Sequence, residues 1–266
     1  MVDGGGAPAS APRVLVEIAP PVATLRFNRP ERLNALTEHC REEFLAALAH
    51  ASAREDVHVV VVTGAGRAFC SGGDLDRLLE LREAGDTAGF ARILDGQLSL
   101  TRALRALPQI AIAAVNGPCG GAGLDVALAC DLRFAAESAT FGAPFLRLGI
   151  LPDATALALL PLAVGYDRSL EMFLEARFVS AEEARAQGLV SRVVPDADLL
   201  PHVHAFAART AARPRELVAS LKQILDDARR VDWSVDAHRA AQLRAFDAPA
   251  SLDAIRAARR TGPGAR

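Results

Sequence analysis

Lysine is almost absent from this chain of 266 residues: Lys222 is the only one, and arginine supplies every other basic side chain except histidine. A Walker-type phosphate loop requires a Gly-Lys-Ser or Gly-Lys-Thr triplet, and the sequence contains neither. Phosphate binding by a lysine-based P-loop is therefore excluded.

The sequence also lacks a large net charge and long apolar runs. The formal net charge is −2, which gives no electrostatic attraction to nucleic acid or an anionic membrane. No apolar stretch approaches the roughly 20 residues of a transmembrane helix. The first residues lack the positive segment and apolar segment of a signal peptide. We predict a cytoplasmic protein that binds neither nucleic acid nor membrane.

Cysteine is scarce and has no metal-ligand pattern. The four cysteines (Cys40, Cys70, Cys119 and Cys130) show neither CxxC nor zinc-ligand spacing. This favours reduced thiols and predicts no metal site.

Apolar residues make up 51% of the chain, enough for a large core. Strand-like runs such as 57–64 and 110–117 alternate with helical patterns such as 35–53 and about 86–106. This order predicts an α/β fold. Residues 1–11 are expected to form a flexible tail, and residues 211–266 a helical region that packs on another subunit or on the active-site mouth.

Two glycine-rich loops, "GAGRAFCSGGD" (64–74) and "GPCGGAG" (117–123), each follow an apolar strand and precede a helix. Backbone N–H groups at a helix start lack intrahelical partners, and the helix dipole favours negative charge there. Glycine lets a substrate approach the backbone closely. Two such loops facing each other would form an oxyanion hole from main-chain atoms.

Two other functions fit these loops poorly. Neither loop has the G-x-G-x-x-G spacing of a dinucleotide site. Ser71 lacks the preceding glycine of a nucleophile elbow, and neither loop contains a histidine. A serine triad stays open only through a tertiary contact.

Four motifs in register resemble the crotonase (enoyl-CoA hydratase/isomerase) superfamily: "FNRPERLNALT", "GAGRAFCSGGDL", "IAIAAVNGPCGGAGLDVALACDLRFAAESATFG" and "FVSAEEARAQGLVSRVVP". The resemblance covers residues from about 13 to 260. It implies a spiral of ββα units over residues 12–210, a helical trimerisation region over 211–266, and trimers or dimers of trimers. It also implies an acyl-CoA thioester as substrate, so that coenzyme A belongs to the substrate and no separate cofactor is expected.

The resemblance further implies roles for individual residues. The two oxyanion-hole amides fall on Gly73 and Ala122. Arg32 and Arg77 are candidates for the CoA phosphates, although both can equally be ordinary solvated arginines. The backbone around Ala68 and Ser71 is expected to receive the adenine.

The acid–base residues depart from the hydratase pattern. Hydratases of this superfamily use two glutamates. In this sequence one of the two positions is Asp125 and the other is Phe145, which cannot transfer protons. The pattern of Phe141, Phe145, Gly149, Pro152 and Asp153 resembles the isomerases of phenylacetate breakdown. Dienoyl-CoA isomerases have aspartates at the positions of both Asp125 and Asp153. The 4-chlorobenzoyl-CoA dehalogenase group uses an aspartate at the position of Asp153 as a nucleophile.

Asp153 therefore has two interpretations. It can cap the following helix by accepting from Thr155 and Ala156 N–H. Alternatively it can move protons in a pocket walled by Phe145, Leu148 and Leu151, which would raise its pKa and exclude water.

Double-bond isomerisation by Asp153 is the predicted activity, because one carboxylate can remove and return the proton. Asp125 is expected to act as a second acid–base group or as a group that positions water. Alternatively, it is only an acidic residue that the dipole at the helix N-terminus stabilises. A hydratase, a CoA-ester hydrolase or dehalogenase, and a non-catalytic CoA-ester-binding subunit remain alternatives.

Overall fold

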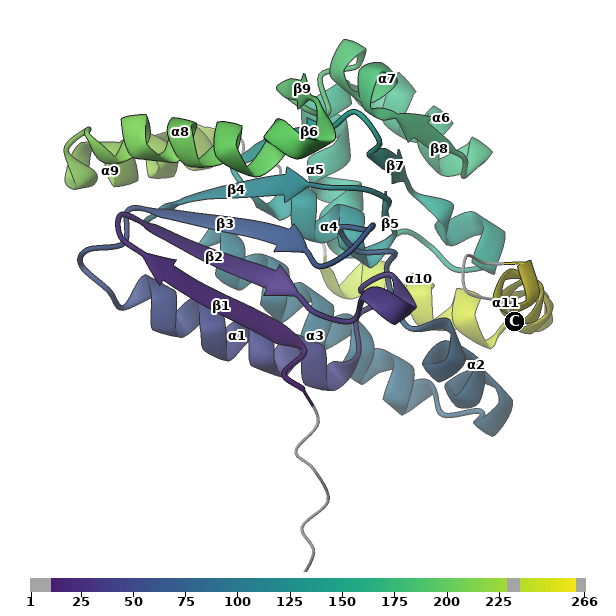
Figure 1. Ribbon diagram of the computed structural model, residues 1–266. Coiled ribbons are helices and arrows are strands. Elements are labelled where there is room, and N and C mark those ends of the chain that lie inside the picture. The colour runs from purple at the N-terminus through teal and green to yellow at the C-terminus, as the bar shows by residue number, and fades with distance from the viewer. Residues whose placement is uncertain (1–10, 229–234, 262–266) are drawn as a thin grey trace, which may run out of the picture.

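The computed structural model describes residues 11–228 and 235–261 (Figure 1), so the predicted tail lies almost wholly outside them. Within these residues the main sheet has six strands. In spatial order they are β1 (Val14–Ala19), β2 (Val22–Phe27), β3 (Val59–Gly64), β4 (Ile110–Val115), β6 (Leu132–Ala136) and β9 (Arg192–Val194). β1 and β2 are antiparallel, and every later neighbouring pair is parallel.

β3 shows why the sheet needs a helical layer on each face. All its residues are buried, with Val60 and Val62 in one hydrophobic cluster and Val59 and Val61 in another. The continuous apolar run predicted this two-sided burial. Figure 1 shows α1 (Glu38–Ser52) and α3 (Thr87–Arg105) below the sheet, and α8 (Leu199–Ala211) and α9 (Arg215–Ala228) above it.

Local signals set several element boundaries. Thr37 caps α1 by accepting a hydrogen bond from Cys40 N at 3.2 Å. The chain reverses between β1 and β2 at Pro20-Pro21, whose peptide bond is cis. Asp74 caps α2 (Leu75–Ala84), which follows the first glycine-rich loop.

A smaller sheet, which the sequence did not predict, contains β5 (Cys119–Gly120), β7 (Thr140–Gly142) and β8 (Phe178–Ser180). Runs of two or three residues are too short to show strand alternation. Beside it, α5 (Ala154–Val164) packs between α4 (Ala122–Ala129) and α6 (Tyr166–Glu175). α7 (Ala181–Ala186) follows β8 and begins with a capping box.

The C-terminal helices take different places. α9 lies on the sheet, and α10 (Val235–Asp247) packs against α3, where the rings of Phe246 and Phe90 stack with centroids 3.9 Å apart. α11 (Pro249–Thr261) contacts α2 and the 3-10 helix η2 (Pro144–Leu148). In the described ranges no helix combines the length and apolar character needed to span a bilayer.

Candidate active site

The two glycine-rich loops meet beyond the carboxyl ends of β3 and β4, which are neighbouring parallel strands. Gly120 N donates to Cys70 O at 3.0 Å, joining one loop to the other. Gly72 has a φ of +115°, and a Cβ built on it would lie 2.9 Å from Gly120 O and 3.5 Å from Ala122 N. Only glycine fits this contact. The predicted convergence of the loops is therefore observed.

Gly73 and Ala122, the predicted oxyanion-hole residues, both line a cavity of about 1100 Å³. Ala122 is the first residue of α4. Within the described part of the chain, neither amide donates a hydrogen bond to a backbone or side-chain acceptor. The cavity wall therefore offers two main-chain donors, one of them at a helix N-terminus.

Asp74 fixes the position of the Gly73 loop. Its carboxylate accepts from Asp76 N at 3.1 Å and forms an ion pair with Arg29 at 3.1 Å. Asn34 holds the start of the same loop, because its Nδ2 donates to Ala68 O at 2.8 Å and Ala65 O at 2.9 Å. The loop is thus tied down on both sides of the oxyanion-hole amide.

Asp153 stands at the N-cap position of α5, but its side chain accepts no capping hydrogen bond. The helix-cap interpretation is therefore wrong. The carboxylate instead lines the large cavity, and Gln242 Nε2 of α10 lies 3.5 Å from Asp153 Oδ1.

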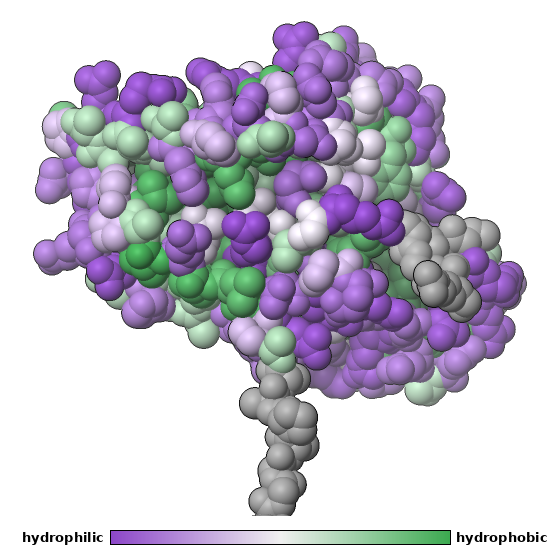
Figure 2. Space-filling model, in the orientation of Figure 1, coloured by the Kyte–Doolittle hydropathy of each residue, from purple (hydrophilic) through white to green (hydrophobic). Residues whose placement is uncertain are grey.

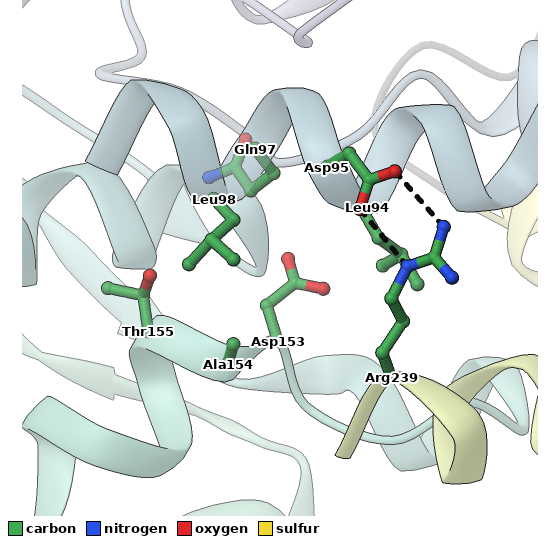
Figure 3. Close-up of a pocket in the computed structure, with 8 residues that line it drawn as sticks. All are labelled: Leu94, Asp95, Gln97, Leu98, Asp153, Ala154, Thr155 and Arg239. Carbon is green, nitrogen blue, oxygen red and sulfur yellow. Dashed lines mark hydrogen bonds and ion pairs between the residues drawn. The ribbon is translucent and has the colours of Figure 1, made fainter. Parts of the chain in front are cut away.

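A second, smaller cavity of about 30 Å³ adjoins the other side of Asp153. Figure 3 shows the Asp153 carboxylate pointing toward α3, with Leu98 on one side and Arg239 of α10 on the other. Arg239 Nη2 forms an ion pair with Asp95 Oδ2 at 3.0 Å across this cavity. The volume suits about one water molecule.

Asp125 is fully buried in α4, and its carboxyl group interacts with the neighbouring carboxyl group of Asp153. Burial raises the pKa of Asp125 well above its ordinary value, and the charge of nearby Asp153 raises that pKa further. Asp125 therefore favours its protonated form more than an exposed aspartate does. It lines neither cavity, so the structure places it behind the wall that Asp153 lines.

The predicted apolar wall is present in part. Phe145 and Leu148 of η2 line the large cavity, whereas Leu151 does not. The Phe145 ring lies within 3.9 Å of a Cβ built on Gly121, next to the oxyanion-hole amide of Ala122. The position held by an acid in hydratases is thus a packed aromatic ring.

The structure brings together only some of the residues that were predicted to bind coenzyme A. Arg32 and Ser71 line the large cavity, but Ala68 and Arg77 do not. Arg77 instead forms ion pairs with Glu38 at 3.1 Å and Glu80 at 3.3 Å. The mouth has further arginines that the sequence analysis missed, because they belong to no motif: Arg256, Arg259 and Arg260 of α11.

Two polar residues of the inner cavity were also missed. Gln97 of α3 donates from Nε2 to Ala122 O at 2.9 Å, and its Oε1 accepts from Arg41 Nε at 3.3 Å. Both residues are buried and line the large cavity. A signal existed for Arg41, which lies three residues before Phe44 and therefore on the apolar face of α1.

The cysteines do not form a nucleophilic or metal site. All four are buried and unpaired, and burial raises the pKa of Cys70 to about 12. The thiols are therefore protonated at neutral pH. Across the described ranges, no three histidine, cysteine or acidic side chains are grouped to hold a metal ion.

Comparison with known proteins agrees with this geometry. The model of the enoyl-CoA hydratase/isomerase family matches residues 17–261. A probable enoyl-CoA hydratase from Rhodobacter capsulatus is 40% identical over 212 residues, which cover 78% of this chain and 78% of that protein. The 1,2-epoxyphenylacetyl-CoA isomerase of Escherichia coli is 33% identical over 229 residues, covering 85% and 87%. A crystal structure of a monofunctional enoyl CoA isomerase from M. smegmatis shows 36% identity and a TM-score of 0.70, covering 85% of this chain and 98% of that one.

These matches and the paired glycine loops define an enzyme of the crotonase fold. The chain belongs to the enoyl-CoA hydratase/isomerase family, and the resemblance of its motifs to the crotonase superfamily is confirmed.

Proposed function

We propose that this protein is an enoyl-CoA isomerase, which moves a double bond within an unsaturated acyl-CoA thioester. The observation that carries the proposal is the placement of the two aspartates. Asp153 lines the cavity together with Gly73 and Ala122, whereas Asp125 is buried behind the wall, where burial raises its pKa. Phe145 lines the cavity at the position where hydratases have a second acidic residue.

The reaction follows from this arrangement. Gly73 and Ala122 N–H donate to the thioester oxygen of a 3-enoyl-CoA. Asp153 takes a proton from the α-carbon, and the electron pair moves into the carbonyl to give a dienolate. Asp153 then returns the proton to the γ-carbon, which yields the 2-enoyl-CoA. Each oxyanion donor lowers such a barrier by roughly 3 kcal/mol. The proposal requires no metal and no cofactor, because coenzyme A is part of the substrate.

Hydration of a 2-enoyl-CoA is the second candidate. Asp125, whose pKa is raised, and its neighbour Asp153 would be a pair of carboxyl groups with different tendencies to hold a proton, which acid–base catalysis of water addition uses. The small cavity beside Asp153 has room for about one water molecule. The burial of Asp125 argues against this candidate, since that acid cannot touch the substrate.

The test compares wild type with Asp153→Asn on a 3-enoyl-CoA in deuterated water. We expect wild type to form the 2-enoyl product, and the variant to lose at least about a hundredfold in rate at an unchanged melting temperature. An unchanged rate in the variant would contradict the proposal. Faster hydration of a 2-enoyl-CoA would favour the second candidate, and release of free CoA would indicate a hydrolase. A protein that shows neither turnover nor exchange of the α-carbon proton would be a binding subunit.

For the nucleotide part of coenzyme A we propose the mouth of the large cavity, where Arg32, Ser71 and the α11 arginines lie. Arg32 and Arg259 both form ion pairs with Asp76, which pre-positions their guanidinium groups. Arginine binds phosphate through paired donors. Arg77 and Ala68 lie outside this cavity and are not included.

We also propose that copies of this chain associate as trimers or dimers of trimers. α9 exposes an apolar face at helical spacing, consisting of Leu217, Leu221, Ile224 and Leu225. Figure 2 shows further apolar surface over the left part of the molecule, where the sheet and α8 lie. Light scattering after size-exclusion chromatography tests this: Leu221→Glu should lower the oligomer mass, and a monomeric wild type would overturn the proposal.

A further inference from the structure

Arg41 is a buried cation in the wall of the large cavity. Only 4% of its surface is exposed, and its Nη1 has no hydrogen-bond partner among the described groups. Its Nε donates a hydrogen bond to Gln97 Oε1 at 3.3 Å. No carboxylate of the described residues lies within 4.0 Å of the guanidinium. A buried, incompletely paired guanidinium is costly and requires an explanation.

Neighbouring groups do not satisfy this charge. Burial raises the pKa of Cys40 to about 11 and that of Cys70 to about 12, so both nearby thiols are neutral. Glu38 already forms an ion pair with Arg77. Asp153 attracts Arg41 electrostatically without forming an ion pair with it.

The fold makes room for this side chain. Gly96 lies in the middle of α3, where glycine lowers helix stability. A Cβ built on Gly96 would lie 3.5 Å from Arg41 Cδ, an ordinary contact distance, so the stem of the arginine packs directly along this part of α3. The side chain therefore reaches the cavity between α1 and α3 rather than the solvent around α1.

We propose that Arg41 binds a hydrogen-bond-accepting oxygen of the acyl group, distinct from the thioester oxygen. This inference rests on the proposed function, because it assumes an acyl-CoA whose reacting carbons lie at Asp153. An arginine only donates hydrogen bonds, so its partner must be an acceptor. The oxygen belongs on the acyl chain beyond the carbons that Asp153 serves.

The charge nearest to Arg41 indicates a neutral oxygen. Asp153 is the acidic group that acts most strongly on Arg41, although the two form no ion pair. An acyl carboxylate bound to Arg41 would lie close to the Asp153 carboxylate and be repelled by it. A ketone, ether or epoxide oxygen would complete the bonding of Arg41 without that repulsion.

The experiment measures binding of saturated acyl-CoA thioesters, which cannot be isomerised. The probes are hexanoyl-CoA, its 4-oxo and 5-oxo derivatives, and adipoyl-CoA as the carboxylate. We expect at least one ketone to bind wild type at least tenfold more tightly than hexanoyl-CoA by calorimetry. Arg41→Met should abolish the preference and keep the affinity for hexanoyl-CoA. Arg54→Met, which changes an exposed arginine, should behave as wild type.

Three results would overturn the inference: equal wild-type affinity for ketones and hexanoyl-CoA, a ketone preference that survives in Arg41→Met, or tightest binding of adipoyl-CoA. If Arg41→Met does not fold, the wild-type comparison alone decides, and Arg41→Lys should keep part of the preference. Failure of the isomerase proposal is seen separately, as absent turnover in an enzyme that still distinguishes ketones from hexanoyl-CoA.

Discussion

Asp125 and Asp153 form a pair of carboxyl groups of which only Asp153 reaches the substrate cavity. Asp125 is completely buried, whereas Asp153 lines both cavities. Burial and the neighbouring charge raise the pKa of Asp125, which favours the protonated form of the inner member. The proposed isomerisation uses the outer member, Asp153, as its base.

Asp125→Asn should change the pH dependence of stability. Because the folded-state pKa of Asp125 is raised, its contribution is fully present below the unfolded pKa of about 4 and is lost as pH rises through the folded-state value. Asparagine has no proton to lose. We expect the free energy of unfolding of the variant, relative to wild type, to increase from pH 5 to pH 8 in urea titrations.

A control for that experiment is Asp167→Asn, which changes an exposed aspartate of α6 and should show no such trend. Asp125→Asn should also keep most of the isomerase rate, since Asp125 lines neither cavity and does not contact the substrate. A difference from wild type that is constant with pH would show that Asp125 is ionised in the folded protein.

Gln242→Leu should lower kcat by about tenfold and change KM little. Gln242 is buried in α10, and its Nε2 lies 3.5 Å from Asp153 Oδ1, so it holds the base in place without lining either cavity. Misplacing a base affects the chemical step more than binding. Gln187→Leu, at the end of α7, serves as the control. Equal kcat values for Gln242→Leu and wild type would show that Asp153 is positioned by other contacts.

The parts of the site that the sequence predicted are those in which local pattern and function coincide. The two glycine-rich loops follow apolar strands and precede helices, so strand–loop–helix order was enough to find the loops, and the family resemblance placed the two amides on Gly73 and Ala122 within them. Arg41 and Gln97 were missed because their hydrogen bond joins α1 to α3, which no local pattern specifies. Arg77 fell outside the cavity because Glu38 and Glu80 offer it nearer partners.

Gly72→Ala should reduce activity by far more than its loss of stability alone would explain. The residue has φ +115°, and an added Cβ would lie 2.9 Å from Gly120 O, so the loops must separate and the two amides diverge. We expect a loss of at least about a hundredfold in kcat, comparable to loss of one oxyanion donor. Gly85→Ala is the matched control: its φ is +64°, but nothing lies within 4 Å of the added Cβ.

Gly85→Ala should therefore cost about 1 kcal/mol of stability through backbone strain and leave kcat unchanged. Similar kcat values for the two variants would show that the contact between the loops does not set the oxyanion hole. The comparison needs only the isomerase assay and thermal melts.

Lys222→Met should destabilise the fold, because the only lysine of the chain lies in a buried polar contact between α9 and the sheet. Its Nζ lies 2.9 Å from Asp131 Oδ2 and 3.1 Å from Gln109 O. Asp131 also accepts from Ala111 N at 2.8 Å, so the aspartate is a structural residue next to β4. Loss of the lysine leaves that carboxylate without its cation, at a cost of about 3 kcal/mol.

The double variant Lys222→Met/Asp131→Asn should recover part of this loss, because it leaves no buried charge unpaired. Arg54→Met is the control, since Arg54 forms an exposed ion pair with Asp56 and should change stability by less than about 1 kcal/mol. Urea denaturation measures all three variants. If Lys222→Met matches Arg54→Met, then apolar contacts rather than this ion pair hold α9 on the sheet.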